Sequence, residues 1–178
     1  MKKKIFLSLL IIVAVFTITG CDKSDIVTKK SGYKTYECRY SKDDNAEGKR
    51  YLTKHIIELN NKDEAEVYRV IAGFTNYGSE TEGYTEFCNG LKNNNQNDLL
   101  EKYKDSVSMK VVCNKENNYQ AYIVKEYKIK KIKDISDFST IYKFLEPYIK
   151  EDGTFDLDAW KNYFNTDSLK AGNYSCDF

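Results

Sequence analysis

The stretch Tyr33–Leu59, YKTYECRYSKDDNAEGKRYLTKHIIEL, decides the fold class, because two alternating segments flank a polar turn. In both segments an apolar or aromatic residue occupies almost every second position, and the polar run 41–48 separates them. Alternation with a period of two is typical of half-buried strands. We therefore predict a hairpin of two antiparallel strands. The first strand carries Tyr36, Cys38 and Tyr40 on one face, and the second carries Tyr51, Thr53, His55, Ile57 and Leu59 on one side with Leu52 and Ile56 on the other.

The chain continues in the order of a mixed domain. The segment 67–77 is rich in β-branched and aromatic residues, which favours a strand, although its apolar spacing also fits a helix. Next, Ser79 and Glu82 form a possible capping box before an apolar helical face of Tyr84, Phe87, Cys88 and Leu91, which Leu99, Leu100 and Tyr103 resume after a break. A second hairpin is predicted from the alternation in 106–113 and 119–132.

The C-terminal third is predicted to be helical. One helix has an apolar stripe over 138–149, is capped by Ser136 or Asp137, and is bent or ends near Pro147. A shorter helix follows Asp156, and the tail 171–178 is expected to be pinned to the body. The order β-β-β-α-β-β-α-α predicts an α+β fold: an antiparallel sheet of about five strands with helices packed on one face. The inward residues of the shorter helix are predicted to be Leu157, Trp160, Tyr163 and Phe164.

A leader of the secretory type precedes this domain. Three lysines at positions 2–4 are followed by an apolar run over 5–18 and by two small residues before Cys21. This order is typical of a secretory signal, and the run is shorter than the roughly 18–20 apolar residues that span a bilayer. We expect residues 1–20 to be a signal peptide.

The last residues of this leader, Ile18-Thr19-Gly20-Cys21, resemble the lipobox of bacterial lipoproteins, in which an aliphatic and a small residue precede glycine or alanine and an invariant cysteine. The resemblance implies that Cys21 receives a diacylglyceryl thioether and becomes the N-terminus. Two acyl chains, at about 0.8 kcal/mol per buried methylene, hold a soluble domain at a membrane surface. We expect a cell-membrane protein anchored on the extracytoplasmic face, with 21–32 as tether and 33–178 as one domain.

The charge balance argues against a nucleic-acid partner. The chain has 28 basic and 27 acidic residues, and three lysines lie in the leader, so the mature part carries 25 minus 27, or −2. No basic patch stands out. We expect no nucleic-acid partner, no cofactor, no metal, and a monomer.

Four cysteines follow Cys21. An even number in an exported chain favours two disulfides, and the spacings contain no CxxC pair of the kind that binds zinc or exchanges electrons. Three pairings are open. Because Cys38 and Cys113 both lie on the apolar side of alternating strands, we favour Cys38–Cys113 with Cys88–Cys176; four buried, reduced thiols are the alternative.

No catalytic set stands out. His55 is the single histidine, so a Ser-His-Asp or Cys-His site would have to include it, yet a lone histidine in an alternating strand is more often a surface or half-buried strand residue. The acidic run 152–158 surrounds Gly153 with the wrong spacing for an EF-hand, and helix capping by Asp156 explains it better. No pair of carboxylates suggests a glycosidase. An exposed aromatic cluster that anchors a partner would draw on Tyr77, Tyr84 and Tyr119.

The order of elements behind a lipobox is similar to that of the small YehR-type bacterial lipoproteins, whose two strand-rich halves are separated by helix and followed by a helix and a glycine-aromatic tail. Here the resemblance rests on 134–164, on Ala171-Gly172-Asn173-Tyr174 and on the strand pairs. It implies the fold and carries over no catalytic motif.

We therefore expect a lipid-anchored domain whose partners are the membrane, through Cys21, and an unidentified protein or small molecule, which it binds without catalysis. Two alternatives remain open. One is an envelope enzyme that uses carboxylates or His55. The other is a structural or accessory lipoprotein whose disulfides serve stability alone.

Overall fold

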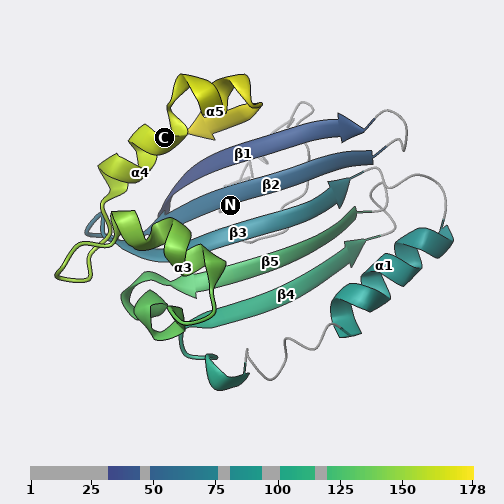
Figure 1. Ribbon diagram of the computed structural model, residues 1–178, viewed down its shortest axis with the longest axis horizontal. Coiled ribbons are helices and arrows are strands. Elements are labelled where there is room, and N and C mark those ends of the chain that lie inside the picture. Colours follow the sequence, from purple (N-terminus) through teal and green to yellow (C-terminus); the bar gives the residue numbers. More distant parts are fainter. Residues whose placement is uncertain (1–31, 45–48, 76–80, 94–100, 115–119) are drawn as a thin grey trace, which may run out of the picture.

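The computed structural model describes residues 32–44, 49–75, 81–93, 101–114 and 120–178. They form one antiparallel sheet in the order β4-β5-β3-β2-β1-β6, accompanied by several short helices (Figure 1). This confirms the predicted α+β class, with six strands where about five were expected. The strands are β1 (Lys34–Asp44), β2 (Lys49–Leu59), β3 (Ala65–Thr75), β4 (Val107–Asn114), β5 (Gln120–Lys128) and β6 (Tyr174–Asp177).

The alternation that predicted β1 and β2 gives the sheet two chemically different faces. In the β1–β2 pair Cys38 lies opposite His55 and Tyr36 opposite Ile57, so these residues share one face, which we call the helix-bearing face. The registers of the other strand pairs place Tyr68 and Tyr127 on this face as well. Along each strand, the residues that alternate with these point to the opposite side of the sheet, which we call the far face.

Two groups of helices pack on the helix-bearing face. Helix α1 (Thr81–Asn93) contacts β4 and β5 at one end of the strands, and α3 (Thr140–Leu145) and α4 (Leu157–Phe164) lie over the other end (Figure 1). The 3₁₀ segment η1 (Ile129–Ile135) lies between β5 and α3 in the chain, η2 (Glu146–Tyr148) lies between α3 and α4, and α5 (Asp167–Ala171) leads into β6. The prediction that helices cover one face is confirmed for the described residues.

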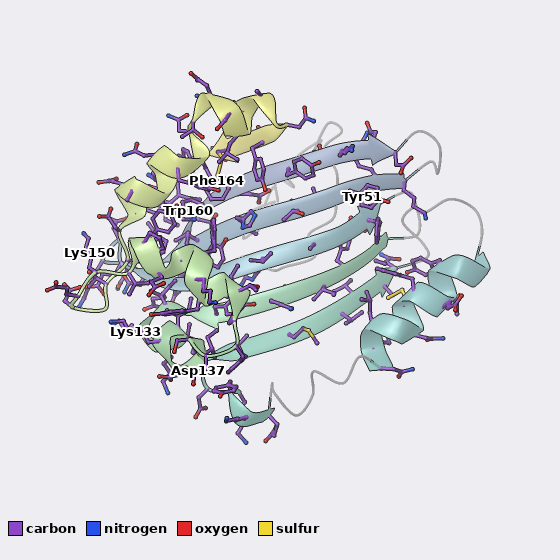
Figure 2. All side chains as sticks on the ribbon, viewed as in Figure 1. Tyr51, Lys133, Asp137, Lys150, Trp160 and Phe164 are labelled. Carbon is purple, nitrogen blue, oxygen red and sulfur yellow. A yellow bond between two sulfur atoms is a disulfide. The ribbon has the colours of Figure 1, made fainter. Side chains whose placement is uncertain are left out.

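The main core lies between α3, α4, η1 and the sheet. Trp160 and Phe164 extend from α4 with their ring centroids 4.8 Å apart, and both are almost fully buried (Figure 2). They meet Tyr68 and Ile57 from the strands and Ile132 from η1. Burial of large aromatic side chains of this kind, about 25 cal/mol per Å² of apolar surface, is the main stabilising term in the fold.

A close approach of two strands requires the glycine in β3. A Cβ atom at Gly73 would lie 2.0 Å from the Ala121 carbonyl oxygen and 2.8 Å from the Tyr122 ring. Gly73 pairs with Tyr122 in the β3–β5 register, so the ring of Tyr122 occupies the space that a side chain would need. Gly73 is therefore a packing requirement of β3.

Several predicted boundaries are corrected. The strand predicted over 119–132 ends at Lys128, where the chain turns into η1 with three buried isoleucines. The predicted helix caps Ser136 and Asp137 are wrong, because Ser136 closes η1 and α3 begins after Ser139. Its end near Pro147 is confirmed, since Pro147 lies in η2.

Three further expectations differ from the structure. Tyr103, predicted to resume a helix, lies in a turn and stacks on Phe138. Tyr163, predicted to point inward, is 41% exposed. The tail is pinned, as predicted, but as the strand β6 on the edge of the sheet. The predictions for 1–31, the Ser79 capping box, Leu99, Leu100, Tyr77 and Tyr119 lie outside the described residues.

Candidate functional site

The described cysteines form two disulfides, but not the two that we favoured. The bonds join Cys38 to Cys176 and Cys88 to Cys113. The predicted pairing of Cys38 with Cys113 and of Cys88 with Cys176 is therefore wrong. The prediction of two disulfides is confirmed, and the two bonds indicate an extracytoplasmic protein, because such bonds persist in oxidising compartments.

The order of the strands explains the error in pairing. Cys38 and Cys113 do lie on the same face, but β1 and β4 are separated by β2, β3 and β5. Four strand spacings amount to about 19 Å, which is far beyond the Cα separation that a disulfide spans. The partner of Cys38 is instead the neighbouring residue of β6, and α1 brings Cys88 over Cys113 of β4.

His55, the single candidate for a catalytic histidine, lies in an aromatic nest on the helix-bearing face. Its Nδ1 atom and the Tyr68 hydroxyl are 2.5 Å apart and share a hydrogen bond. The rings of Phe164, Phe144 and Tyr174 surround it at centroid distances of 5.2, 5.9 and 6.2 Å. Burial lowers the pKa of His55 from 6.5 to about 4, so the imidazole is neutral near pH 7.

This environment does not resemble a nucleophile–histidine site. The cysteine opposite His55 is Cys38, whose sulfur is bonded to Cys176 and therefore cannot form a thiolate. The hydrogen-bond partner is a phenol whose own pKa is raised well above 10 by burial. His55 is therefore a half-buried structural histidine, one of the two environments that the alternating strand predicted.

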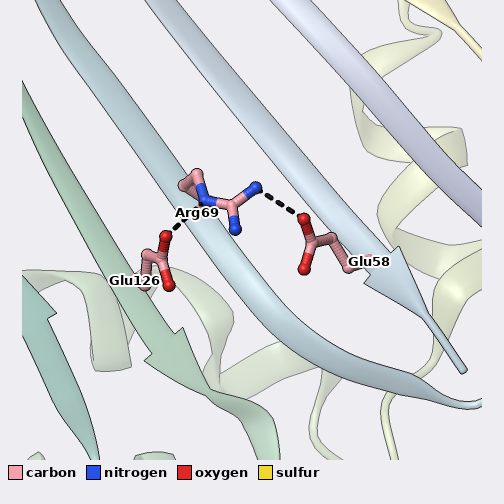
Figure 3. A network of polar contacts seen from close by, with 3 residues as sticks. All are labelled: Glu58, Arg69 and Glu126. Atoms are coloured by element: carbon pink, nitrogen blue, oxygen red, sulfur yellow. Dashed lines mark hydrogen bonds and ion pairs between the residues drawn. The ribbon is translucent and has the colours of Figure 1, made fainter. Parts of the chain in front are cut away.

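A buried ion cluster occupies the far face. Arg69 of β3 donates from Nη1 to Oε1 of Glu58 over 2.6 Å and from Nε to Oε1 of Glu126 over 2.9 Å (Figure 3). The Glu58 side chain is fully buried and that of Arg69 is 5% exposed, whereas Glu126 is 40% exposed. The cluster holds two carboxylates and one guanidinium, and within the described residues the second oxygen of Glu58 receives no hydrogen bond.

Sequence reasoning missed this cluster, although one signal was present. Glu58 follows Ile56 and Ile57 and precedes Leu59, so a charged residue interrupts an apolar run at the end of a strand. Arg69 is one of only three arginines in the chain. Their pairing depends on the β2–β3 and β3–β5 registers, which bring together Glu58, Arg69 and Glu126 from three strands.

Beside the ion cluster, the far face carries a group of apolar residues, which we call the far-face cluster: Leu52, Ile56, Ile71, Tyr122 and Val124, with Val112 packed against it. The five principal side chains are between 0 and 7% exposed. Every described member of this group comes from a strand, whereas the cores on the helix-bearing face include helix residues. Antiparallel sheets that pack one face against a core commonly leave the other face polar and solvated. The far face of this sheet is instead apolar and buried at these five residues.

A polar hollow of about 500 Å³ lies at the β1–β6 edge of the same face. Its charged lining groups are Glu37 and Asp177, which are opposite each other in the β1–β6 pair, and Arg39, which is opposite Ser175. Glu37 is also bridged to Lys54 over 3.1 Å. The remaining described lining residues are Thr35, Ser41, Asn173, Ser175 and Cys176.

The hollow combines both charges with hydroxyl and amide groups, and it has the volume of a small-ligand site. The Cys38–Cys176 bond lies directly beneath it and fixes β6 to β1. Because the rim is a four-residue edge strand, this bond keeps the lining groups in register. The arrangement can hold a small ligand through ion pairs and hydrogen bonds.

The other predicted site residues are accounted for by local structure. The Asp156 carboxylate accepts a hydrogen bond from the Ala159 amide over 3.0 Å, so the predicted helix cap is confirmed. Asp152 accepts from the Thr154 amide in the preceding turn. Tyr84 is buried and donates to the Gln120 carbonyl, so it is not part of an exposed aromatic cluster. Among the described residues no group of three acidic, histidine or cysteine side chains is arranged to hold a metal.

Cys21, the predicted lipidation site, lies outside the described residues. None of the described helices has the length and hydropathy needed to cross a bilayer. No family model, no curated protein and no solved structure matches the chain.

Proposed function

We propose that this chain is a lipid-anchored binding module of the bacterial surface that holds a small polar ligand in the β1–β6 hollow and performs no catalysis. The observation that carries the proposal is the hollow itself, a concavity of about 500 Å³ lined by Glu37, Arg39 and Asp177 and held in register by a disulfide. Ligand sites of this volume are common in proteins that bind small molecules.

The lining favours a ligand that carries both charges. Asp177 attracts an ammonium group, with Glu37, already paired with Lys54, beside it, while Arg39 suits a carboxylate or phosphate. Hydroxyl groups of the lining can bind the neutral part of such a molecule. The expected ligand class is therefore zwitterionic, as in amino acids and short peptides.

The anchor part of the proposal draws on the leader and on the disulfides. The resemblance of Ile18-Thr19-Gly20-Cys21 to a lipobox supports acylation of Cys21, and the two disulfides agree with export. The proposed similarity to YehR-type lipoproteins agrees with the same location. A surface anchor keeps a binding module at the membrane without any contact between its body and lipid.

The test uses nuclear magnetic resonance of the isotope-labelled protein titrated with diglycine as the zwitterionic probe. We expect saturable shifts in the backbone amides of Glu37, Arg39, Ser175 and Asp177. Asp177→Asn should weaken binding about fivefold to tenfold, because an ion pair to the ammonium group is lost. The matched control is Asp158→Asn, which neutralises an exposed acid of α4 and should leave the affinity unchanged.

Two results would overturn the proposal. One is that diglycine causes no saturable shift at the hollow. The other is that the shifts occur around His55 and Tyr68 on the opposite face, which would favour the alternative of an envelope enzyme that uses His55.

A further inference from the structure

The segment that follows β5 gathers positive charge at one end of the sheet. In a 3₁₀ helix the side chains at i and i+3 eclipse, so η1 places Ile129, Ile132 and Ile135 in one row, and all three are buried. The other two rows, together with the residue before η1, carry exposed lysines, which we call the basic ridge: Lys128, Lys130, Lys131 and Lys133. Figure 2 shows Lys133 at this end of the molecule.

The basic ridge lacks acidic partners within the part of the chain that the structure describes. No ion pair between described residues involves any of its four lysines. The acid within η1, Asp134, accepts a hydrogen bond from the Ser106 hydroxyl over 3.0 Å instead. By contrast, the nearby Lys104 lies 2.7 Å from its partner Glu101. The ridge therefore presents positive charge that the described residues do not neutralise.

An exposed aromatic pair, Tyr103 and Phe138, borders the basic ridge. Phe138, three residues after η1, is 42% exposed, and its ring centroid lies 4.2 Å from that of Tyr103. The turn that carries Tyr103 is held against the ridge, since the Lys128 amide donates to the Ser106 carbonyl over 2.9 Å. Lys102 lies over the Tyr103 ring, 5.0 Å from its centroid. Aromatic rings beside lysines are typical of surfaces that meet the headgroup region of a membrane.

The local charge is opposite in sign to the charge of the mature part as a whole. Residues 101–106 and 128–138 hold six lysines and four acidic residues, a balance of +2, whereas the mature part carries −2. The electric field of a charged surface falls off within about 10 Å at physiological salt. A domain that is held at a membrane therefore responds to the charge of the side that faces it, and its total charge matters less.

The basic ridge lies at the end of the sheet where β1 begins. Lys34, the first residue of β1, is opposite Leu59, the last residue of β2. β5 ends at Lys128, which is opposite Val67 near the start of β3. The start of β1 and the start of η1 are thus at the same end, three strand spacings or about 14 Å apart. An anchor on Cys21, which precedes β1, would attach the domain at this end.

We infer that the basic ridge and the aromatic pair form a docking surface for the anionic phospholipid headgroups of the membrane that holds the anchor. The lysines bind headgroup phosphates, and the rings of Phe138 and Tyr103 lie at the boundary between headgroups and acyl chains. Charge complementarity, the aromatic pair and the position beside the start of β1 favour lipid over a soluble polyanion. The inference rests on the anchored part of the proposed function.

The docking surface adds an orientation that the anchor alone does not give. Two acyl chains hold a domain near the membrane but leave it free to turn. With the basic ridge against the headgroups, the strands rise from the membrane, and the end that carries α1 faces away from it. The polar hollow, which lies along β1, then opens to the side and stays accessible to a ligand.

Lysine footprinting of the full chain tests this inference. The protein from its native membrane is reconstituted in vesicles of phosphatidylcholine or of phosphatidylglycerol, acetylated with a water-soluble reagent and mapped by mass spectrometry. We expect Lys130, Lys131 and Lys133 to react about fivefold more slowly on phosphatidylglycerol, which is the gain that one lysine makes at an anionic surface. The matched controls are Lys42 and Lys92, which are exposed at the other end of the strands and should react equally on both.

Charge neutralisation tests the ridge without altering the anchor. The double substitution Lys130→Gln and Lys133→Gln should weaken docking about 25-fold, so Lys131 should react on phosphatidylglycerol nearly as fast as on phosphatidylcholine. The control pair Lys42→Gln and Lys92→Gln removes the same charge from the other end of the sheet and should leave the protection of Lys131 unchanged.

The outcomes separate this inference from the proposed function. Equal reaction of the ridge on the two kinds of vesicle would overturn the inference alone, and so would equal protection by soluble polyphosphate, which would assign the ridge to a soluble polyanion. A chain that associates with neither kind of vesicle would overturn the inference and the anchor together. An uncleaved leader would contradict acylation of Cys21 but would still hold the chain in vesicles, so the footprint would still decide. Failure of diglycine to bind would contradict only the role of the hollow.

Discussion

Cys38 and Cys176 lie directly opposite each other in the antiparallel β1–β6 pair and are joined by a disulfide across 138 residues of sequence. The bond fixes a four-residue edge strand that has a neighbour on one side only. It also fixes the rim of the polar hollow. Stability and the candidate site therefore depend on the same covalent link.

Removal of this bond by the double substitution Cys38→Ala and Cys176→Ala should be strongly destabilising. A closed loop of this length corresponds to about 5 kcal/mol in the chain-entropy model, against about 3.5 kcal/mol for the shorter Cys88–Cys113 loop. Chemical denaturation of the two double variants measures the difference. In the Cys38→Ala and Cys176→Ala variant, limited proteolysis should also cleave between α5 and β6, whereas the Cys88→Ala and Cys113→Ala variant should keep this tail protected.

The buried ion cluster predicts an asymmetric response to substitution. Arg69→Met leaves the Glu58 carboxylate buried without its partner and should cost about 3–5 kcal/mol. Glu58→Gln keeps an oxygen for Arg69 and should cost about 1–2 kcal/mol. Urea denaturation of both variants provides the comparison.

The control for the ion cluster is Arg50→Met. Arg50 and Asp43 form an ion pair with side chains 40% and 56% exposed, so its loss should cost less than about 1 kcal/mol. Equal losses of unfolding free energy in Arg50→Met and Arg69→Met would contradict the conclusion that burial makes the loss of Arg69 more costly.

The lowered pKa of His55 predicts that the free energy of unfolding depends on pH. Because its pKa is about 4 in the folded chain and 6.5 when unperturbed, protonation favours the unfolded state. The stabilisation is complete above pH 6.5 and is lost as the pH falls from 6.5 toward 4, by at most roughly 3 kcal/mol. Thermal denaturation across this range should show the decline, and His55→Phe should reduce its slope.

Because His55 is the single histidine, its imidazole proton resonance can be followed without assignment ambiguity. A titration midpoint near pH 4 would support the buried, neutral state. A midpoint at 6.5 with an unchanged fold would show that solvent reaches the aromatic nest.

Local patterns explain which elements could be predicted. The alternation around Tyr36 and Cys38 and around His55 and Ile57 reflects a sheet with one face against helices, so it marked β1 and β2. Asp156 was recognisable as a cap because the cap acts three residues away, at Ala159. Signals of this kind depend only on neighbouring residues.

The ion cluster and the hollow could not be predicted, because each depends on the pairing of strands that lie far apart in the sequence. Glu126 reaches Arg69 across 57 residues, and Cys176 reaches Cys38 only because a short strand pairs with the outer side of β1. A four-residue strand carries too little alternation to be recognised from sequence. The wrong disulfide pairing followed from this missing sixth strand.

We propose that the chain is an exported, lipid-anchored domain, and the structure joins its cysteines in two specific disulfides. Intact and peptide mass spectrometry of the protein from its native membrane, without and with reductant, tests this claim most directly. We predict a diacylglyceryl-modified Cys21 at the N-terminus and linked peptides that join Cys38 to Cys176 and Cys88 to Cys113. An uncleaved leader together with four free thiols would contradict the claim.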